Sequence, residues 1–417
     1  MKKLIYLTGQ IDSPFLTNEI DEFVKEFDEV FVIAYGEDRK VCDEISRVHN
    51  FKYALIDDVH FGIKTFSKLR KWKKQDYVKE EIKRAKSIRP KKFKRKLYVY
   101  YYGIYALKLN KILENYFNDE DEFYVYSFWL SRPAFGVATL MNERKEVRRA
   151  VSRTHRYDLY EEENDLSYLP FRKFITEHLN TIYFSSLDTV NYFDGKNYSD
   201  NKPKYKLAYL GTKEYSHKVI DGNKKGITIA SCSYIIQRKR LDLIIDLIKN
   251  VSKLCSDVTW LHIGDGADEE KIKELASREL TGVKYEFLGK MADEDIFKTY
   301  ESKDVDFFVN LSDSEGIPVS ILEAMSMGIP IIARNVGGIA DAVGSDTGVL
   351  IEESGDALGG GVERAAKAIV DVFNDKERYR KLSASVYGKW KERFSTAENS
   401  KRVAMDIISD AEIKENK

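Results

Sequence analysis

Short runs of β-branched and aromatic residues alternate along the chain with stretches of helical periodicity. This alternation predicts parallel β-sheets whose strands are joined by crossover helices. In the first half, strands are expected at residues 3–7, 29–34, 123–128, 150–154 and 181–185, with a helix at 18–27. The pattern starts afresh after residue 202, with strands expected at 227–231, 259–263, 285–288, 306–310, 329–333 and 349–351. The fold class is therefore α/β, with more than one domain.

A polar stretch, DGKNYSDNKPK, separates the two halves and has the composition of a linker. We expect an N-terminal domain over residues 1–195 and a C-terminal domain over residues 203–395. The last segment, residues 396–417, is expected to be a helix that crosses back to the first domain.

Charge, cysteine content and hydropathy bear on the partners of the protein and on the compartment in which it works. Lys+Arg and Asp+Glu both count 68, so the net charge is zero and gives no support for a nucleic-acid partner. The three cysteines show no CxxC spacing, which suits a reducing compartment. The N-terminus has no signal-peptide core, and the longest uncharged apolar run covers eleven residues, 97–107. We therefore expect a cytoplasmic protein.

The block NLSDSEGIPVSILEAMSMGIPIIARNVGG, residues 310–338, holds the candidate chemistry. A strand is expected to end at Asn310 and a helix to run from residue 319 to 327, with Pro318 at its first position. The free N–H groups of this helix would then lie at the carboxyl end of a parallel strand, where such sheets bind ligands. Glu315 and Glu323 add two carboxylates that can accept hydrogen bonds from vicinal hydroxyls. Taken singly, they are equally well a helix cap and an ordinary helix glutamate.

The joint pattern of this block resembles glycosyltransferase family 4. Glu315 and Glu323 have the family's E-x7-E spacing, and EG-x-P, LEAM, G-x-P and GG surround them in the same order. The resemblance implies the GT-B fold, in which two Rossmann-like domains face each other across a cleft. It also implies sugar transfer from a nucleotide sugar with retention of configuration, with the donor on the C-terminal domain and the acceptor on the N-terminal domain. The chain also resembles bacterial members of the family that build surface polysaccharides.

The resemblance also assigns roles across the second domain. Lys239 maps to the lysine that binds the leaving diphosphate, which it would stabilise together with the helix N-terminus in place of a metal. Glu315 would hold donor-sugar hydroxyls and Glu323 the ribose. The family arginine maps to Ser233, so Arg238 or Arg240 would have to replace its charge, and the sequence favours neither. Further donor contacts are implied at Gly316, Ile317, Pro318, Gly264, Gly289, Lys290 and Met291.

In the first domain, the segments YSFWLSRPAFG and SRTHRYDLYEE carry a weaker resemblance. His155 fits the family histidine that ends a strand and faces the donor sugar. A lone histidine is also common as a structural residue.

Metal and cofactor signals are weak. Three DxD-like triplets begin at Asp119, Asp293 and Asp304, but no cluster with ligand spacing accompanies them. The glycine pair at Gly264 and Gly266 lacks the third glycine of a dinucleotide fingerprint. We expect no metal and no cofactor, with the nucleotide sugar as a substrate.

The segment from Lys64 to Lys96 carries sixteen Lys and Arg residues against three acids, with Phe66, Leu69, Trp72 and Tyr77 between them. This pattern predicts either a solvated helix pair or an interfacial surface that attaches to anionic lipid at the inner face of the cell membrane. Two other functions stay open. One is a nucleotide-sugar epimerase of related fold, which needs no acceptor, and the other is a non-catalytic nucleotide-sugar-binding scaffold in a glycosylation complex.

Overall fold

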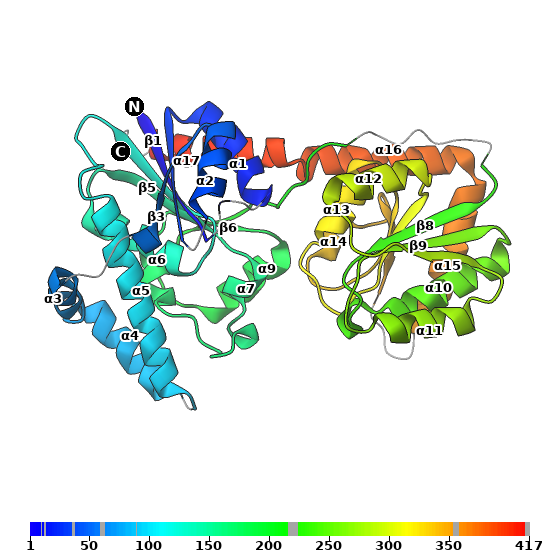
Figure 1. The fold of residues 1–417 in the computed structure, drawn as a ribbon, viewed down its shortest axis with the longest axis horizontal. Helices are drawn as coiled ribbons and strands as arrows, with labels where there is room; N and C mark the ends of the chain where they lie inside the picture. The colour runs from blue at the N-terminus through cyan, green and yellow to red at the C-terminus, as the bar shows by residue number, and fades with distance from the viewer. Residues whose placement is uncertain are drawn as a thin grey trace. The chain divides into compact units, whose positions relative to one another are not determined.

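The structure is a computed structural model that describes residues 1–9, 11, 14–35, 38–58, 63–88, 90–215, 224–352 and 358–412. The chain divides into two compact units (Figure 1). The first contains Met1–Leu210 and the chain from Asn399 onward, and the second contains Gly211–Glu398. Each unit is built on its own parallel sheet.

The first unit has a seven-stranded parallel sheet in the order β3-β2-β1-β4-β5-β6-β7. The strand order reverses between β1 and β4, as in doubly wound α/β proteins. The strands are β1 (Lys2–Leu7), β2 (Glu29–Ala34), β3 (Lys52–Leu55), β4 (Glu122–Ser127), β5 (Val147–Arg153), β6 (Thr181–Phe184) and β7 (Lys204–Leu207). The helices are α1 (Pro14–Glu26), α2 (Arg39–Val48), α3 (Ile63–Trp72), α4 (Asp76–Ser87), α5 (Lys92–Ile112), α6 (Arg132–Glu143), α7 (Arg156–Leu159), α8 (Arg172–His178), α9 (Leu187–Lys196) and α17 (Thr396–Glu412).

Alternate side chains of the central strands bury into opposite cores, because successive residues of a strand point to opposite faces. Ile5 and Leu7 of β1 pack with α5 and α6 on one face. Leu4 and Tyr6 pack with α1 and with Val403, Ala404 and Ile407 of α17 on the other, where Figure 1 draws α17 beside β1. The near-continuous apolar runs of these strands thus reflect burial on both faces.

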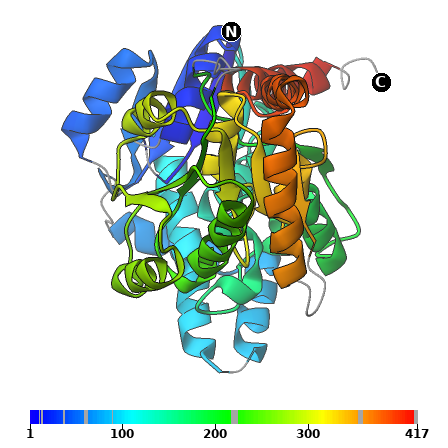
Figure 2. The same ribbon diagram turned by 90° about the vertical axis from the view of Figure 1, so that its right-hand side faces the viewer.

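The second unit has a six-stranded parallel sheet in the order β10-β9-β8-β11-β12-β13, reversing between β8 and β11. Its strands are β8 (Ile227–Cys232), β9 (Val258–Ile263), β10 (Lys284–Phe287), β11 (Phe307–Asn310), β12 (Ile331–Arg334) and β13 (Gly348–Ile351). Its helices are α10 (Leu241–Leu254), α11 (Glu269–Glu279), α12 (Asp293–Ser302), α13 (Val319–Ser326), α14 (Ile339–Ala342), α15 (Leu358–Asn374) and α16 (Lys376–Arg393). Helices α10 and α15 lie side by side over one face of this sheet (Figure 2).

The boundary between the units lies later than the expected linker. Residues 187–196 form α9, and residues 204–207 form β7, which pairs with β6 through Thr181 and Lys204. The sequence KYKL hides this strand because it is the edge strand and half exposed, so it lacks an apolar run. The first unit therefore extends to Leu210.

The C-terminal helix α17 joins the first unit from Asn399 onward. Asn399 donates a hydrogen bond to the carbonyl of Tyr209 at 3.0 Å. Asp406 accepts one from the buried Tyr183 hydroxyl at 2.7 Å and pairs with Lys206. This helix is thus held to β6 and β7 by polar contacts as well as by its apolar face. Within the described residues no helix has both the length and the apolarity that a bilayer span requires.

Candidate functional site

Two loops meet at the carboxyl edge of the second sheet, where the strand order reverses between β8 and β11. One loop follows β8 and leads through the short 3-10 helix Gln237–Lys239 into α10. The other follows β11 and leads into α13. The backbone N–H of Asp313 donates to the carbonyl of Arg238 at 2.9 Å and ties the loops together. A reversal of this kind opens the crevice in which parallel sheets bind ligands.

Lys239 and Glu315 face each other across these loops. The Lys239 Nζ lies 2.5 Å from Glu315 Oε1, and the side chains are 14% and 10% exposed. A pair this shielded interacts more strongly than a surface ion pair, because little water screens it. The structure thus brings together two predicted site residues that are 76 positions apart. An anion that approaches Lys239 must compete with a carboxylate already in place.

Glu323 lies in the second turn of α13 and is 9% exposed. Its carboxyl group has no hydrogen-bond partner among the described residues. Burial, with a smaller contribution from the negative charge of Asp293, raises the pKa of Glu323 to about 7. A buried acceptor without a donor is costly unless a ligand supplies one. The helix itself starts at Val319, as expected, and Pro318 is its N-cap.

The two candidate arginines differ in their surroundings. Arg240 donates to both Asp242 and Asp313 at 3.0 Å, and Arg334 also pairs with Asp313. The exposed side chain of Arg238 makes no polar contact with the described residues. Ser233 donates its hydroxyl to the carbonyl of Tyr234 at 3.3 Å. Arg240 is therefore engaged in holding the two loops, whereas Arg238 has its guanidinium in solvent.

Gly264 and Gly289 form part of the loop packing. Gly264 has φ +133°, and a Cβ there would lie 1.9 Å from the Ser233 carbonyl oxygen. Its N–H donates to the Gly289 carbonyl at 2.8 Å. This close approach explains why glycine stands at position 264. Beyond Gly289, Lys290 is exposed, and Met291 Sδ lies 3.6 Å from the Thr299 hydroxyl.

Gly316 and Ile317 lie between Glu315 and α13, both partly exposed. A Cβ on Gly316 would meet no atom within 4 Å, so space at this glycine is open. The sequence pattern did not indicate the remaining neighbours of Glu323. Besides Asp293, they include Tyr215, whose ring stacks on Phe297, the buried Tyr300, and Cys232, whose thiol pKa burial raises to about 12. No motif links these residues, because they come from three separate segments.

His155 belongs to the first unit, two residues beyond β5. Its Nε2 lies 2.9 Å from the carbonyl oxygen of Phe128, and its ring packs 4.5 Å from the rings of both Phe128 and Trp129. Burial, reinforced by the charge of Arg153, lowers the pKa of His155 to about 3. Since a carbonyl only accepts, Nε2 carries the proton and Nδ1 keeps a lone pair. The imidazole is thus neutral, and as the residue before α7 it accepts from the backbone N–H of Asp158 in a capping box.

The basic segment differs from its expected form. Trp72 is 5% exposed within the core, Tyr77 stacks on Phe174, and Leu69 packs against the same core. The side chains of Lys64 and Phe66, together with residue Arg89, lie outside the part of the chain that the structure describes. The interleaved aromatic residues therefore do not form an interfacial face as predicted. Apolar side chains are exposed instead on α5, at Phe93, Leu97 and Tyr101.

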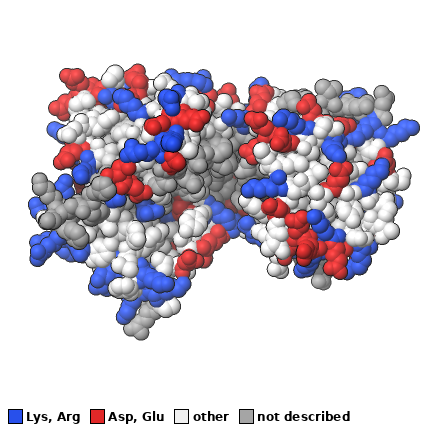
Figure 3. Space-filling model, in the orientation of Figure 1, with Lys and Arg blue, Asp and Glu red and all other residues white. Residues whose placement is uncertain are grey.

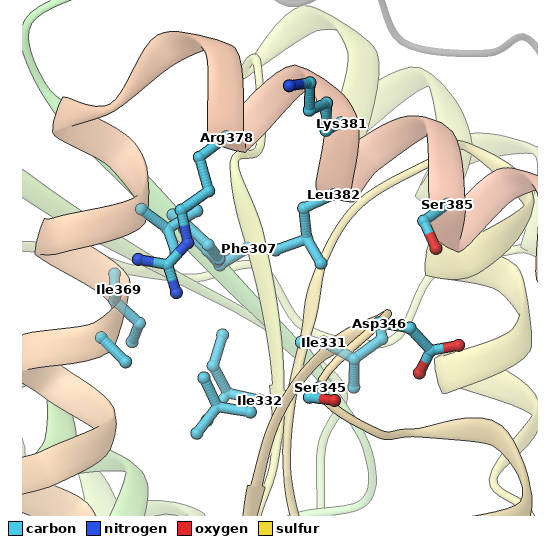
Figure 4. A pocket seen from close by; sticks show the side chains of 14 residues that line it. Phe307, Ile331, Ile332, Ser345, Asp346, Ile369, Arg378, Lys381, Leu382 and Ser385 are labelled. Carbon is cyan, nitrogen blue, oxygen red and sulfur yellow. The ribbon is translucent and has the colours of Figure 1, made fainter.

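Two further features of the described residues bear on the site. No group of three or more His, Cys, Asp and Glu side chains among them lies close enough to hold a metal ion. A cavity of about 260 Å³ lies at the opposite edge of the second sheet, lined by Phe307, Ile331 and Gly348, the first residues of their strands (Figure 4). It includes none of the predicted site residues, so the site and this cavity are separate.

The second unit matches a known protein family. Residues 212–388 match the family model described as Glycosyl transferases group 1. The Lys239–Glu315 pair and Glu323 lie inside the matched region, so the similarity to glycosyltransferases includes the candidate site.

Curated relatives match between about a third and a half of the chain. A GDP-mannose-dependent monoacylated alpha-(1-6)-phosphatidylinositol monomannoside mannosyltransferase of Corynebacterium glutamicum is 27% identical over 162 residues, 38% of this chain and 40% of that protein. The O-antigen biosynthesis glycosyltransferase WbnH of Escherichia coli is 30% identical over 130 residues, 31% of this chain and 34% of that protein. The chain thus spans well under two thirds of these curated relatives.

Solved structures extend the similarity to both units. The Anabaena protein HepE, crystallised in complex with UDP, aligns with a TM-score of 0.65 at 15% identity over 98% of this chain and 100% of HepE. The fold is therefore the two-domain Rossmann-like α/β fold of GT-B proteins.

The raised pKa of Glu323 in α13 predicts how the stability of the protein depends on pH. Folding keeps a proton on Glu323 between its ordinary pKa of 4.5 and about 7. Its contribution to stability is thus full below pH 4.5 and is lost as the pH rises through 7. Glu323→Gln removes the charge, so we expect it to raise the free energy of unfolding by about 2–3 kcal/mol at pH 8 and little at pH 4.5. Urea titrations without nucleotide measure this, with the exposed Glu301→Gln on α12 as the control. An equal effect at both pH values would contradict the prediction.

Proposed function

We propose that this protein is a retaining glycosyltransferase that moves a sugar from a nucleoside-diphosphate sugar onto an acceptor. The observation that carries the proposal is the Lys239–Glu315 pair at the strand-order reversal of a glycosyltransferase group 1 domain. A cation and a carboxylate there are what a diphosphate and a sugar hydroxyl need.

In this proposal the diphosphate binds Lys239 and the N-terminal N–H groups of α13, where positive charge and free donors coincide. Arg238 supplies the second cation, which is supported by its lack of polar contacts with the described residues, whereas Arg240 is engaged by Asp242 and Asp313. Glu323 accepts from the ribose hydroxyls, which supplies the donors that its buried carboxylate lacks. The base lies against the loop of Gly289, Lys290 and Met291.

The reaction breaks the bond between the anomeric carbon and the phosphate oxygen while the acceptor oxygen bonds to that carbon. Negative charge grows on the leaving diphosphate, and the fixed ammonium of Lys239 stabilises it more in the transition state than in the ground state. The acceptor hydroxyl proton leaves with the diphosphate, which balances the charge. Glu315 orients the sugar through its hydroxyls. The low pKa of His155 excludes this residue as a general acid near neutral pH. Retention is the outcome that resemblance to family 4 implies.

The acceptor is a carbohydrate, lipid-linked or glycoconjugate molecule of bacterial surface assembly. The name of the Corynebacterium relative places its acceptor on a phosphatidylinositol lipid, and the Escherichia coli relative is named for O-antigen biosynthesis. The complex of HepE with UDP makes uridine nucleotides the first probes to use.

Turnover should depend on the ion pair. Glu315→Ala should lower sugar release from the active donor at least a hundredfold while the melting temperature stays near wild type, because this carboxylate lies on a loop.

Lys239→Ala removes a charge-assisted contact of about 1.5–3 kcal/mol, so the UDP dissociation constant measured by calorimetry should rise by about tenfold to a hundredfold. Lys271→Ala, an exposed lysine of α11, is the control. Wild-type turnover in the first variant and unchanged affinity in the second would contradict the proposal.

The reaction should need no divalent metal, because Lys239 and the helix N-terminus supply the positive charge. We expect the rate of nucleotide release to be unchanged in excess EDTA. Loss of the rate, with recovery on addition of magnesium or manganese, would show that a metal takes part.

We also propose that the first unit attaches to anionic lipid through α3, α4 and α5, at the inner face of the cell membrane. Among the described side chains of the segment from Lys64 to Lys96, eleven cations are exposed: Lys68, Arg70, Lys71, Lys73, Lys74, Lys79, Lys83, Lys86, Lys91, Lys92 and Lys94. Figure 3 shows basic side chains gathered at the end of α4 and α5 that lies lowest in that view.

The apolar part of this surface is the stripe Phe93, Leu97 and Tyr101, spaced four residues apart on one side of α5 and 69%, 45% and 59% exposed. Apolar side chains flanked by lysines are the pattern of an interfacial helix. Arg95 does not contribute, because it is 4% exposed and donates to the carbonyls of Leu166 and Ile88.

Vesicle binding tests this surface. Each lysine near anionic lipid contributes about 1 kcal/mol, so replacing Lys92, Lys94 and Lys96 with glutamate should weaken binding to phosphatidylserine vesicles by about a hundredfold or more. Wild-type binding should also fall with added salt. Lys271→Glu on the second unit is the matched control. Equal co-sedimentation with anionic and neutral vesicles at low salt would refute the attachment.

A further inference from the structure

A groove of about 300 Å³ lies in the first unit between α4 and α8, apart from the residues assigned above. Its walls are aromatic: Phe174 stacks on Tyr77 at 4.1 Å, and Phe171 packs 6.1 Å from Tyr77. Tyr198 closes another side. Flat apolar rings with a few placed polar groups are the usual lining of a small-molecule site.

Two polar atoms of this groove lack partners within the described part of the chain. Arg172 is 1% exposed, and its two terminal nitrogens donate to the carbonyls of Leu130 and Asp158. Its Nε–H has no acceptor, and neither does the buried hydroxyl of Tyr198, which also lines the groove. Buried donors are almost always satisfied, so these two atoms mark unmet hydrogen-bonding capacity in residues that line the groove.

The charges of the groove restrict what it binds. Four carboxylates line it, from Asp76, Glu80, Glu81 and Glu177, against three cations, from Arg84, Arg172 and Lys173. Arg84 and Lys173 pair with Glu81 and Glu80 at 3.1 and 3.3 Å. A phosphate would meet this acidic surplus and be repelled. An uncharged ligand with many hydroxyls suits the mixture, because carboxylates accept from hydroxyls and guanidinium and tyrosine groups donate to them.

We propose that the α4–α8 groove binds an uncharged sugar unit of the acceptor, with Arg172 and Tyr198 as hydrogen-bond donors, Glu177 as an acceptor and the aromatic walls against the ring. The identification of this sugar as part of the acceptor rests on the proposed function, but sugar binding in the α4–α8 groove does not require a nucleotide.

The same arginine links the groove to the predicted sugar-facing histidine. The carboxylate of Asp158 accepts from the backbone N–H of His155 at 2.7 Å and of Leu130 at 2.6 Å. Arg172 holds the carbonyls of these same two loop residues, Asp158 and Leu130. Arg172 is therefore a positioning residue, and a sugar that completes its Nε–H fixes the loop that presents His155.

Saturation-transfer NMR on the full chain without nucleotide tests the groove. The probes are the methyl glycosides of glucose, galactose, mannose and N-acetylglucosamine at millimolar concentration. We expect at least one to bind, and we expect Tyr198→Phe and Glu177→Ala each to raise its dissociation constant about fivefold, the effect of one lost hydrogen bond. Tyr205→Phe, a part-buried tyrosine of β7 outside the groove, is the matched control and should change nothing.

The outcomes separate this proposal from the proposed function. Sugar binding that survives Glu323→Gln and saturating UDP supports the groove, even if Glu315→Ala were found to turn over normally. Absence of binding by all four glycosides, binding that both groove variants leave unchanged, or binding that UDP abolishes would each overturn the groove as a sugar site.

Discussion

Close backbone contacts that glycine alone permits hold the carboxyl edge of the second sheet together. Gly337 has φ +55°, and a Cβ there would lie 1.9 Å from the Glu315 carbonyl oxygen. Gly264 approaches the Ser233 carbonyl just as closely. The loop after β9 can therefore pack directly on the loop after β8, and the loop after β12 on the loop after β11. The hydrogen bond from the Asp313 N–H to the Arg238 carbonyl then joins the two loops that carry Lys239 and Glu315. Any larger residue at these glycines would push the loops apart and separate the pair.

The electrostatics of the site follow from this packing. The opposite charges of Lys239 and Glu315 compensate each other away from solvent, so the unliganded protein can bury both groups. Glu323 has no such partner, and its raised pKa is the measure of that cost. A nucleotide sugar would reverse both conditions, because its diphosphate competes for Lys239 and its ribose supplies donors to Glu323. In the proposed complex, the free energy of donor binding would include a cost at Lys239, where the diphosphate competes with Glu315, and a gain at Glu323, which receives hydrogen-bond donors.

The sequence alone predicted the parts of this site that lie in one contiguous block. Glu315, Glu323 and the strand before them are local features of that block, whereas Lys239 was placed by the resemblance of a separate segment, residues 231–248, to the family. Residues brought in by tertiary contact, such as Asp293 and Tyr215 beside Glu323, have no local signal.

Most strands were predicted within a few residues, because burial on both faces gives them apolar runs. The edge strands β3 and β7 were missed, since KYAL and KYKL mix lysine with apolar residues. The predicted interfacial face of the basic segment was wrong for a similar reason. Composition shows the lysines of this segment, but only tertiary packing decides that Trp72 and Tyr77 face the core while Phe93 and Tyr101 face solvent.

The central claim is that the second unit binds a nucleoside diphosphate at the loops after β8 and β11. A crystal structure of the full chain with UDP tests it most directly. The account predicts diphosphate oxygens within about 3 Å of Lys239 Nζ and ribose hydroxyls at the same distance from the Glu323 carboxylate. A nucleotide bound at the opposite edge of the sheet, in the cavity lined by Phe307 and Ile331, with the Lys239–Glu315 pair undisturbed, would contradict it.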